Sequence, residues 1–228
     1  MNASGTRNLS IQTVLSGGEG DDKFGLFTGT PEMGGSSIDI YGGAGNDKIS
    51  GAVGFAVANI NGDAGDDIVY DVEEDYGMSM RFYSLGEGDD VFFGGSGGQV
   101  EVEGGSGNDK IFGPSDGYGT HIVELKGDDG DDIIDHGDGN YGDYGWGGLG
   151  NDKIIGGLAY GYGRYYGEEG DDKIWMINPE QRALAEEPLV GWYGYGGPGN
   201  DHMYGSDIGE FLVGDDGALT RVAGELHI

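Results

Sequence analysis

Short apolar segments with a period of two recur along the chain. Ile38 and Ile40 flank one polar residue, as do Val100 and Val102. In an extended chain alternate side chains point to the same face, so this pattern indicates strands with one buried face. A further apolar position follows each segment after a glycine-rich stretch, at Phe24, Ile49, Val69, Phe92, Ile111, Ile134, Ile154, Ile174 and Met203. The pattern predicts units of two short strands joined by a turn.

The glycine-rich stretches are copies of one motif, Gly-Gly-x-Gly-[Asp/Asn]-Asp-x-apolar, whose residues are numbered below as positions one to eight. Nine copies begin at Gly17, Gly42, Gly62, Leu85, Gly104, Gly127, Gly147, Gly167 and Gly196. Position six is aspartate in all nine, and successive copies lie 19 to 29 residues apart. A supersecondary unit that repeats about every 20 residues is typical of a solenoid, in which each coil buries its apolar face against its neighbours.

Two short strands fit within about 20 residues if the chain winds into a flattened coil and each strand pairs with its equivalent in the next coil. We therefore expect an all-β fold, a right-handed parallel β-roll or β-solenoid. Glycine at the turns allows backbone with positive φ and close approach of neighbouring coils.

Composition and charge exclude several classes of protein and partner. The 228 residues include 53 glycines but only 5 prolines without a three-residue period, which excludes collagen. The net charge of −31 argues against nucleic acid and anionic membrane as partners and favours cations. No apolar run is long enough to insert into a membrane. Because the chain has no cysteine, disulfides and zinc–thiolate sites are excluded.

The nonapeptide Gly-Gly-x-Gly-x-Asp-x-apolar-x resembles the calcium-binding repeat of the RTX (repeat-in-toxin, haemolysin-type) family over roughly residues 17–204. The resemblance implies that aspartates of one turn and main-chain carbonyls of neighbouring turns enclose Ca²⁺ between stacked coils. In the commonest form of the family the motif recurs every nine residues and metal lines both edges. Here it recurs about every twenty, so we expect one calcium-lined edge and one metal-free edge.

Calcium prefers six to eight oxygen ligands, and the repeat supplies only oxygens. Position-six carboxylates would lie in a file at the strand spacing of about 4.8 Å, which is repulsive unless cations neutralise it. We expect about six to eight ions, each between successive turns. Position-five residues are expected to contribute mainly carbonyls and turn geometry. The candidate metal residues are Gly17, Glu19, Asp21, Asp22, Gly42, Ala44, Asn46, Asp47, Gly62, Ala64, Asp66, Asp67, Asp89, Asp90, Gly104, Ser106, Asn108, Asp109, Gly127, Asp129, Asp131, Asp132, Gly147, Leu149, Asn151, Asp152, Gly167, Glu169, Asp171, Asp172, Gly196, Pro198, Asn200 and Asp201.

The expected organisation is an N-terminal cap at residues 1–16, the roll at 17–213 and a C-terminal cap at 214–228. Asn178-Pro179-Glu180 fits a helix start and Pro188 a stop, so a short helical insertion is expected at 178–188. It would account for the longest spacing between copies.

Tyrosines gather in the C-terminal half, and their segments admit two interpretations: filling and capping of the roll, or an exposed face that binds a glycan or a protein. They are Tyr141, Tyr144, Tyr160, Tyr162, Tyr165, Tyr166, Tyr193 and Tyr195, with Trp146 and Trp192. No Ser/His/Asp set, HExxH motif or phosphate loop occurs, which favours a non-enzymatic protein.

The sequence thus favours a calcium-dependently folded, secreted or cell-surface β-roll acting as scaffold, secretion or adhesion module. The export route stays open, because the first residues lack the pattern of a cleaved signal peptide. Two alternatives stay open too. One is a polysaccharide-active enzyme of the epimerase or lyase kind, or its carbohydrate-binding module, and the other is a metal-free solenoid whose aspartates serve only as turn residues.

Overall fold

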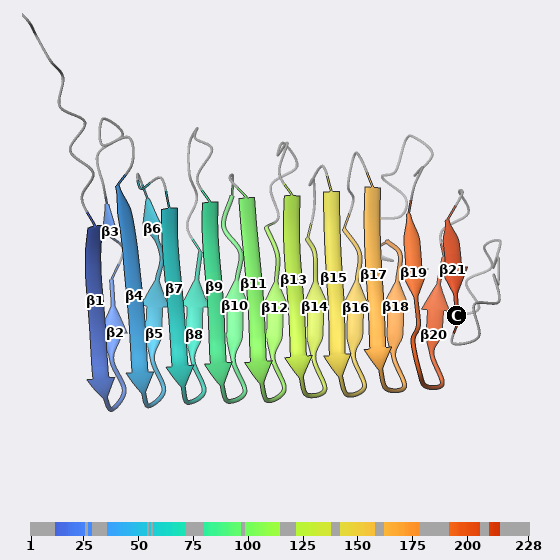
Figure 1. Ribbon diagram of the computed structural model, residues 1–228, viewed down its shortest axis with the longest axis horizontal. Coiled ribbons are helices and arrows are strands. Elements are labelled where there is room, and N and C mark those ends of the chain that lie inside the picture. Colours follow the sequence, from blue (N-terminus) through green and yellow to red (C-terminus); the bar gives the residue numbers. More distant parts are fainter. Residues whose placement is uncertain are drawn as a thin grey trace, which may run out of the picture.

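The computed structural model describes residues 12–25, 27–28, 36–53, 55, 57–71, 80–96, 99–114, 122–137, 142–157, 162–177, 192–205 and 210–214. These residues form a right-handed parallel β-solenoid (Figure 1). The segment 178–188, expected to be helical, lies outside the described residues, as do 1–11 and 215–228. No helix among the described residues is long and apolar enough to cross a bilayer.

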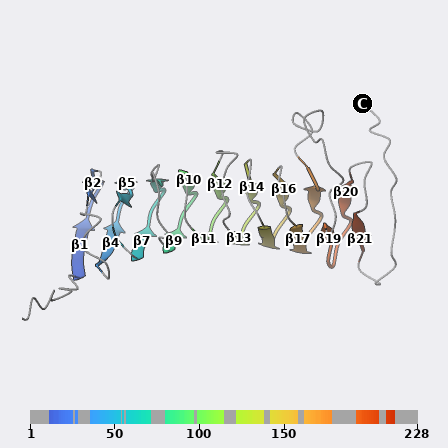
Figure 2. The same cartoon turned by 90° about the horizontal axis from the view of Figure 1, so that it is seen from above.

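Two parallel sheets make up the coil walls, and Figure 2 shows them as two separate rows of strands. The first, called the long sheet, contains β1 (Gln12–Glu19), β4 (Ser37–Ala44), β7 (Val57–Ala64), β9 (Met80–Glu87), β11 (Gln99–Ser106), β13 (Ile122–Asp129), β15 (Gly142–Leu149), β17 (Tyr162–Glu169), β19 (Tyr193–Tyr195) and β21 (Phe211–Val213).

The second, called the short sheet, contains β2 (Lys23–Phe24), β5 (Lys48–Ser50), β8 (Ile68–Tyr70), β10 (Val91–Phe93), β12 (Lys110–Phe112), β14 (Ile133–Asp135), β16 (Lys153–Ile155), β18 (Lys173–Trp175) and β20 (His202–Tyr204). A two-stranded sheet of β3 (Phe27–Thr28) and β6 (Ala52–Val53) lies beyond it. The nine repeated turns join each long strand to the short strand that follows, so they gather at one edge of the roll, called the turn edge.

The core is the thin layer between the sheets, as the alternation predicted. Ile40 in β4 and Ile49 in β5 are both fully buried, and the equivalent positions of later coils continue these two rows. Because each coil contributes only a few apolar side chains, its stability depends on stacking against the coils before and after it.

Aromatic side chains replace the aliphatic row near the C-terminal end. Tyr165 and Trp192 are fully buried, and their rings lie 5.8 Å apart. Glycines leave room for them: a Cβ on Gly145 would contact the Tyr165 ring, and one on Gly163 would overlap the Trp192 ring. Trp146, Tyr166 and Tyr195 instead stack on the outer face of the long sheet. Tyr141 and Tyr160 lie outside the described residues. The tyrosine-rich segments therefore fill the roll and also cover its outside.

The glycine at position one has a steric role that does not involve φ. A Cβ on Gly147 would come within 3.0 Å of both the Asp152 carboxylate and the Gly167 carbonyl oxygen of the next coil. The same crowding occurs at Gly17, Gly42, Gly62, Gly104, Gly127 and Gly167. A methyl group at position one therefore competes for the space in which the position-six carboxylate lies.

We predict that Gly147→Ala destabilises the calcium-loaded fold by about 1–3 kcal/mol, the usual cost of overpacking a fixed interior. Gly25→Ala is the matched control, because nothing lies within 4 Å of a Cβ at Gly25. Urea unfolding of both variants in calcium measures the difference. Equal midpoints for the two variants would contradict the steric assignment.

Candidate metal centre

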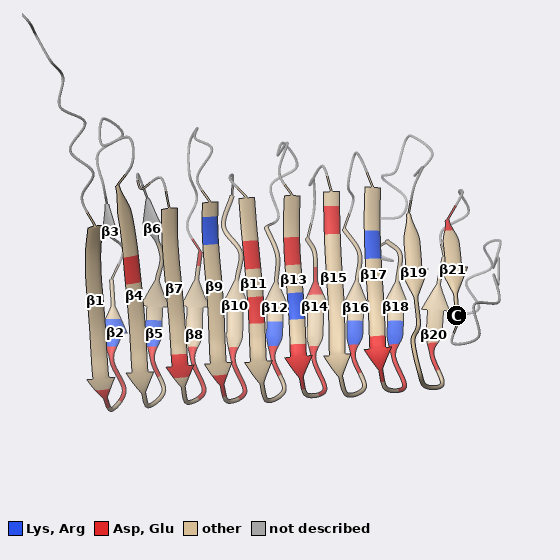
Figure 3. Ribbon diagram, viewed as in Figure 1, with Lys and Arg blue, Asp and Glu red and all other residues tan. Residues whose placement is uncertain are grey.

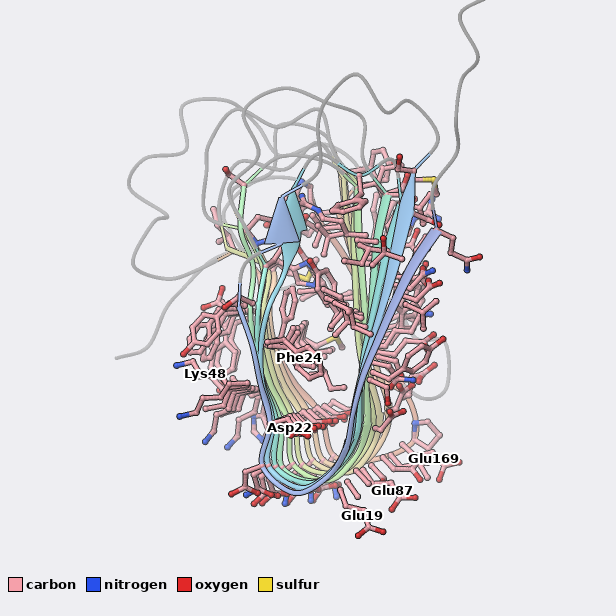
Figure 4. All side chains as sticks on the ribbon, turned by 90° about the vertical axis from the view of Figure 1, so that its left-hand side faces the viewer. Glu19, Asp22, Phe24, Lys48, Glu87 and Glu169 are labelled. Carbon is pink, nitrogen blue, oxygen red and sulfur yellow. The ribbon has the colours of Figure 1, made fainter. Side chains whose placement is uncertain are left out.

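The position-six aspartates form a file inside the turn edge, which Figure 4 shows as a row of oxygens crossing the interior at the level of Asp22. Between Asp47 and Asp172 their side chains are at most 2% exposed. From Asp47 to Asp201, each Oδ1 accepts a hydrogen bond from the main-chain N–H of the equivalent aspartate in the preceding coil, over 2.6–3.0 Å. The file is therefore one continuous ladder of carboxylates and amides.

The second carboxylate oxygen differs sharply from the first. Oδ2 is buried and has no hydrogen-bond partner among the described residues in Asp22, Asp47, Asp67, Asp90, Asp109, Asp132, Asp152 and Asp172. A buried, unpaired anionic oxygen is costly, because folding removes its water and supplies nothing in exchange. Eight such atoms lie in one file, where cations would satisfy them.

Main-chain carbonyls complete the donor set. In seven coils the point where a position-one Cβ would lie is close to both Oδ2 of its own coil and the position-one carbonyl oxygen of the next. The pairing register of the long strands skips position one in six of these seven coil pairs, as at Gly42 and Gly62 between Tyr41–Asn61 and Gly43–Asp63, and in the seventh it ends just before position one. The position-one carbonyl is thus set apart from the regular ladder and lies beside the carboxylate.

Position five lies on the other side of the backbone. Asp21, Asn46, Asp66 and their equivalents are exposed, and each Oδ1 accepts the position-five N–H of the following coil over 2.7–3.1 Å. This outer ladder runs in the opposite direction to the inner one. Either residue type can stand at position five, because the side-chain oxygen of Asn accepts the bond as that of Asp does. These side chains lie away from the buried oxygens.

The main-chain carbonyls at position three already accept hydrogen bonds. The carbonyl of Ala44 accepts the N–H of Gly20, and the carbonyl of Ala64 accepts the N–H of Gly45, at 2.6 and 2.8 Å. The carbonyls of Glu87, Ser106, Asp129, Leu149, Glu169 and Pro198 are bonded in the same way. Position-three carbonyls are therefore main-chain ladder acceptors, and among the candidate residues the inward-facing oxygens belong to positions one and six.

One coil breaks the pattern. Leu85 stands at position one of the fourth turn, and its side chain is fully buried. It fills the space that glycine leaves open elsewhere, although Asp90 keeps its place in the ladder through the N–H of Asp67. Position two varies as well: Asp63, Asp128 and Glu168 replace glycine there and adopt φ of 72–74°, a left-handed conformation that costs non-glycine residues energy.

Burial raises the pKa of six position-six carboxyls, while the hydrogen bond from the preceding amide lowers it in part and neighbouring carboxylates raise it further. The pKa is raised to about 7 for Asp67, Asp109 and Asp152, and to about 6 for Asp90, Asp132 and Asp172. Without a cation, the folded file therefore holds protons that an exposed aspartate would have lost.

The donor chemistry fits calcium. Nowhere in the described residues do three or more His, Asp or Glu side chains converge on one point, because each coil supplies a single inner carboxylate. A cation here must draw part of its ligand set from main-chain carbonyls, and a set of carboxylate and carbonyl oxygens suits Ca²⁺. The residues that would hold it are the position-six aspartates and the position-one residues.

Comparison with known families agrees with this geometry. The profile of the family described as RTX calcium-binding nonapeptide repeat (4 copies) matches residues 39–55, 84–98, 101–113, 140–159 and 195–207. The chain contains RTX-type calcium-binding repeats. These matches contain the second, fourth, fifth, seventh and ninth turns, and RTX repeats bind calcium. No curated protein and no solved structure matches the chain.

The RTX turn geometry extends beyond the matched segments. Three of the four unmatched turns carry Asp63, Asp128 or Glu168 at position two, yet Asp67, Asp132 and Asp172 occupy the same ladder as the matched aspartates. The substitutions change the outside of the turn and leave the inner file intact.

A polar pair that the sequence analysis did not identify lies at the edge opposite the turns. Arg81 and Asp71 form a buried ion pair at 3.1 Å, and the Tyr83 hydroxyl donates to the same carboxylate oxygen. Arg81 occupies the row of Ala58 and Val100. The one available signal was the break in that apolar row. At this edge a fixed cation, Arg81, partners the buried carboxylate.

The neighbouring positions five and six allow a matched test. We predict that Asp132→Asn weakens calcium binding and lowers stability in calcium, because it removes an inward negative oxygen but keeps an acceptor for the Asp109 amide. In chelator the same variant should be more structured than the parent, since one buried charge is gone.

Asp131→Asn is the control, because asparagine already stands at position five in other turns. Calcium titration followed by circular dichroism separates the two variants. A loss of calcium binding in Asp131→Asn equal to that in Asp132→Asn would contradict the inward assignment of position six.

The raised pKa values predict that the calcium-free fold becomes more stable as the pH falls. Because the folded-state pKa values lie above the unfolded value of 3.8, the calcium-free fold binds more protons than the unfolded chain between about pH 4 and pH 7. Its stability should therefore increase as the pH falls from 7.5 to 5 and be lost again on return. Circular dichroism of calcium-free protein measures this, and a β signal that is constant or that increases with pH would contradict it.

Proposed function

We propose that this protein is an extracellular or cell-surface module that folds when it binds calcium and then serves as a rigid scaffold or adhesive segment. The observation that supports the proposal is the file of eight buried Oδ2 atoms without partners. Divalent cations would remove the repulsion along the file, so that the free energy of binding becomes free energy of folding.

The proposed extracellular location rests on the calcium concentration that folding would require. Extracellular calcium modules typically bind with dissociation constants of about 10⁻⁴–10⁻³ M, far above cytosolic calcium. A chain with net charge −31 and an unneutralised inner file would stay largely unfolded inside a cell. It would fold after export.

The geometry also supports a number of ions. Seven coils combine an inward carboxylate with an open position-one glycine and a neighbouring carbonyl, at Gly17, Gly42, Gly62, Gly104, Gly127, Gly147 and Gly167. Leu85 fills the equivalent space in the fourth coil. We therefore propose seven ions, all at the turn edge. The opposite edge holds the Arg81–Asp71 pair in its third and fourth coils.

The proposal is tested by titrating calcium into chelator-treated protein. The far-UV β signal should be largely absent in chelator and appear cooperatively with calcium, and native mass spectrometry should count seven bound ions. Magnesium is the control: it prefers octahedral geometry at about 2.0–2.1 Å and releases water reluctantly, so it should not restore the fold. An unchanged β signal in excess chelator would refute the proposal.

A further inference from the structure

A hollow of about 250 Å³ opens on the outer face of the long sheet, over β4, β7, β9 and β11. Its lining includes Tyr41, Phe82, Asn59, Asn61 and Ser84, with Glu101 and Glu103 at one side. The hollow lies on the opposite side of the sheet from the core, and none of these side chains belongs to the calcium ladder. It is smaller than the pockets of about 300–1,000 Å³ that hold drug-sized molecules, so it suits a single small ring.

Three aromatic residues line the hollow; Tyr83 is buried in the core, and the other two, Tyr41 and Phe82, differ from the other rings on this face. Trp146, Tyr166 and Tyr195 stack at 5.8 and 4.8 Å with planes within 8°, so their faces cover one another and their edges face solvent. Tyr41 and Phe82 stack on no ring among the described residues. Tyr41 is 40% exposed. No other ring among the described residues therefore covers their faces, whereas the rings of the C-terminal ladder cover one another.

Polar side chains lie on β7, between the strands that carry the two rings, and next to Phe82 on β9. The Asn59 side-chain amide donates to Asp39 at 2.6 Å, which leaves its carbonyl oxygen as an acceptor. The Asn61 carbonyl oxygen accepts the Asp63 N–H at 3.2 Å, which leaves its amide group as a donor. Ser84 adds a hydroxyl that can donate or accept. Within the described part of the chain these remaining groups make no other hydrogen bond, so an acceptor, a donor and a hydroxyl are available to one ligand.

The charge around the hollow selects against acidic ligands. Lys126 donates to both Glu101 and Glu103 at 2.9 Å, so one ammonium group is shared by two carboxylates and the side of the hollow stays negative. The chain as a whole carries −31. An anionic ligand would meet repulsion from both sources.

Open aromatic faces, alternating donors and acceptors, a small volume and a negative rim together match a sugar ring, which has apolar C–H faces and hydroxyls at its edge. We propose that the hollow between Tyr41 and Phe82 binds one pyranose residue of an uncharged glycan. A protein partner would need a contact of about 800 Å² per side, far more than this hollow offers. The site makes the calcium-stabilised roll a carbohydrate-binding surface in addition to a scaffold.

The test starts from a glycan array probed with calcium-loaded protein, followed by calorimetric titration of the best trisaccharide. Binding should be confined to uncharged glycans, with uronate-containing and sialylated glycans failing to bind. Tyr41→Ala should weaken binding at least about tenfold, whereas Tyr41→Phe should keep it because the ring face remains. Tyr166→Ala is the matched control, since it removes an outer-face ring whose faces are already covered, and it should leave affinity unchanged.

Circular dichroism in calcium shows whether each variant is folded, which separates failure of the site from failure of the calcium-dependent fold. Asn61→Leu gives a second, independent check, because it removes the donor without touching either ring. No array binding at millimolar glycan, a preference for uronates, or an equal loss in Tyr41→Ala and Tyr166→Ala would each overturn the proposal.

Discussion

Burial of like charges at the spacing of β-strands is the constraint on which this molecule depends. Parallel coils place equivalent residues about 4.8 Å apart, so an aspartate repeated at one turn position becomes a line of carboxylates inside the protein. Half of each carboxylate is satisfied by the preceding amide, and the other half has no partner among the described residues. A main-chain ladder can hold such a line in place, but it cannot neutralise it. That task falls to cations, and the oxygen-only surroundings select calcium.

Other features of the turn edge follow from this constraint. Glycine at position one leaves the space that the carboxylate and the neighbouring carbonyl share. At the one turn with a larger residue at position one, the buried Leu85 side chain occupies that space. The other acidic residues of the turns lie outside, where water and salt screen them. The lysines of the short sheet lie next to them at the turn edge (Figure 3). Exposed Lys48, for example, lies over the Tyr70 ring at 4.9 Å, so the lysine row also packs on aromatic neighbours.

The sequence predicted the larger features because they repeat. Alternation at Ile38 and Ile40 identified strands, and nine invariant aspartates identified the file at the turn edge. It also distinguished position six from position five, as for Asp132 and Asp131, because aspartate is invariant at position six whereas asparagine replaces it at position five. The period-two rule could not have made that distinction, since it holds only in extended chain and fails inside a turn. Nor could the sequence analysis find the Arg81–Asp71 pair, whose partners lie in different coils and meet only after the register is set. The tyrosines were ambiguous for a similar reason: Tyr165 and Tyr166 are neighbours in sequence, yet one is buried and the other lies on the outer face.

The most direct measurement is an anomalous-difference map from a crystal grown in calcium. The account predicts a single row of peaks inside the turn edge, each beside an aspartate Oδ2 of position six, with a gap at the coil of Leu85. A folded crystal without peaks in that row, or with peaks only outside the turn beside the position-five side chains, would contradict it.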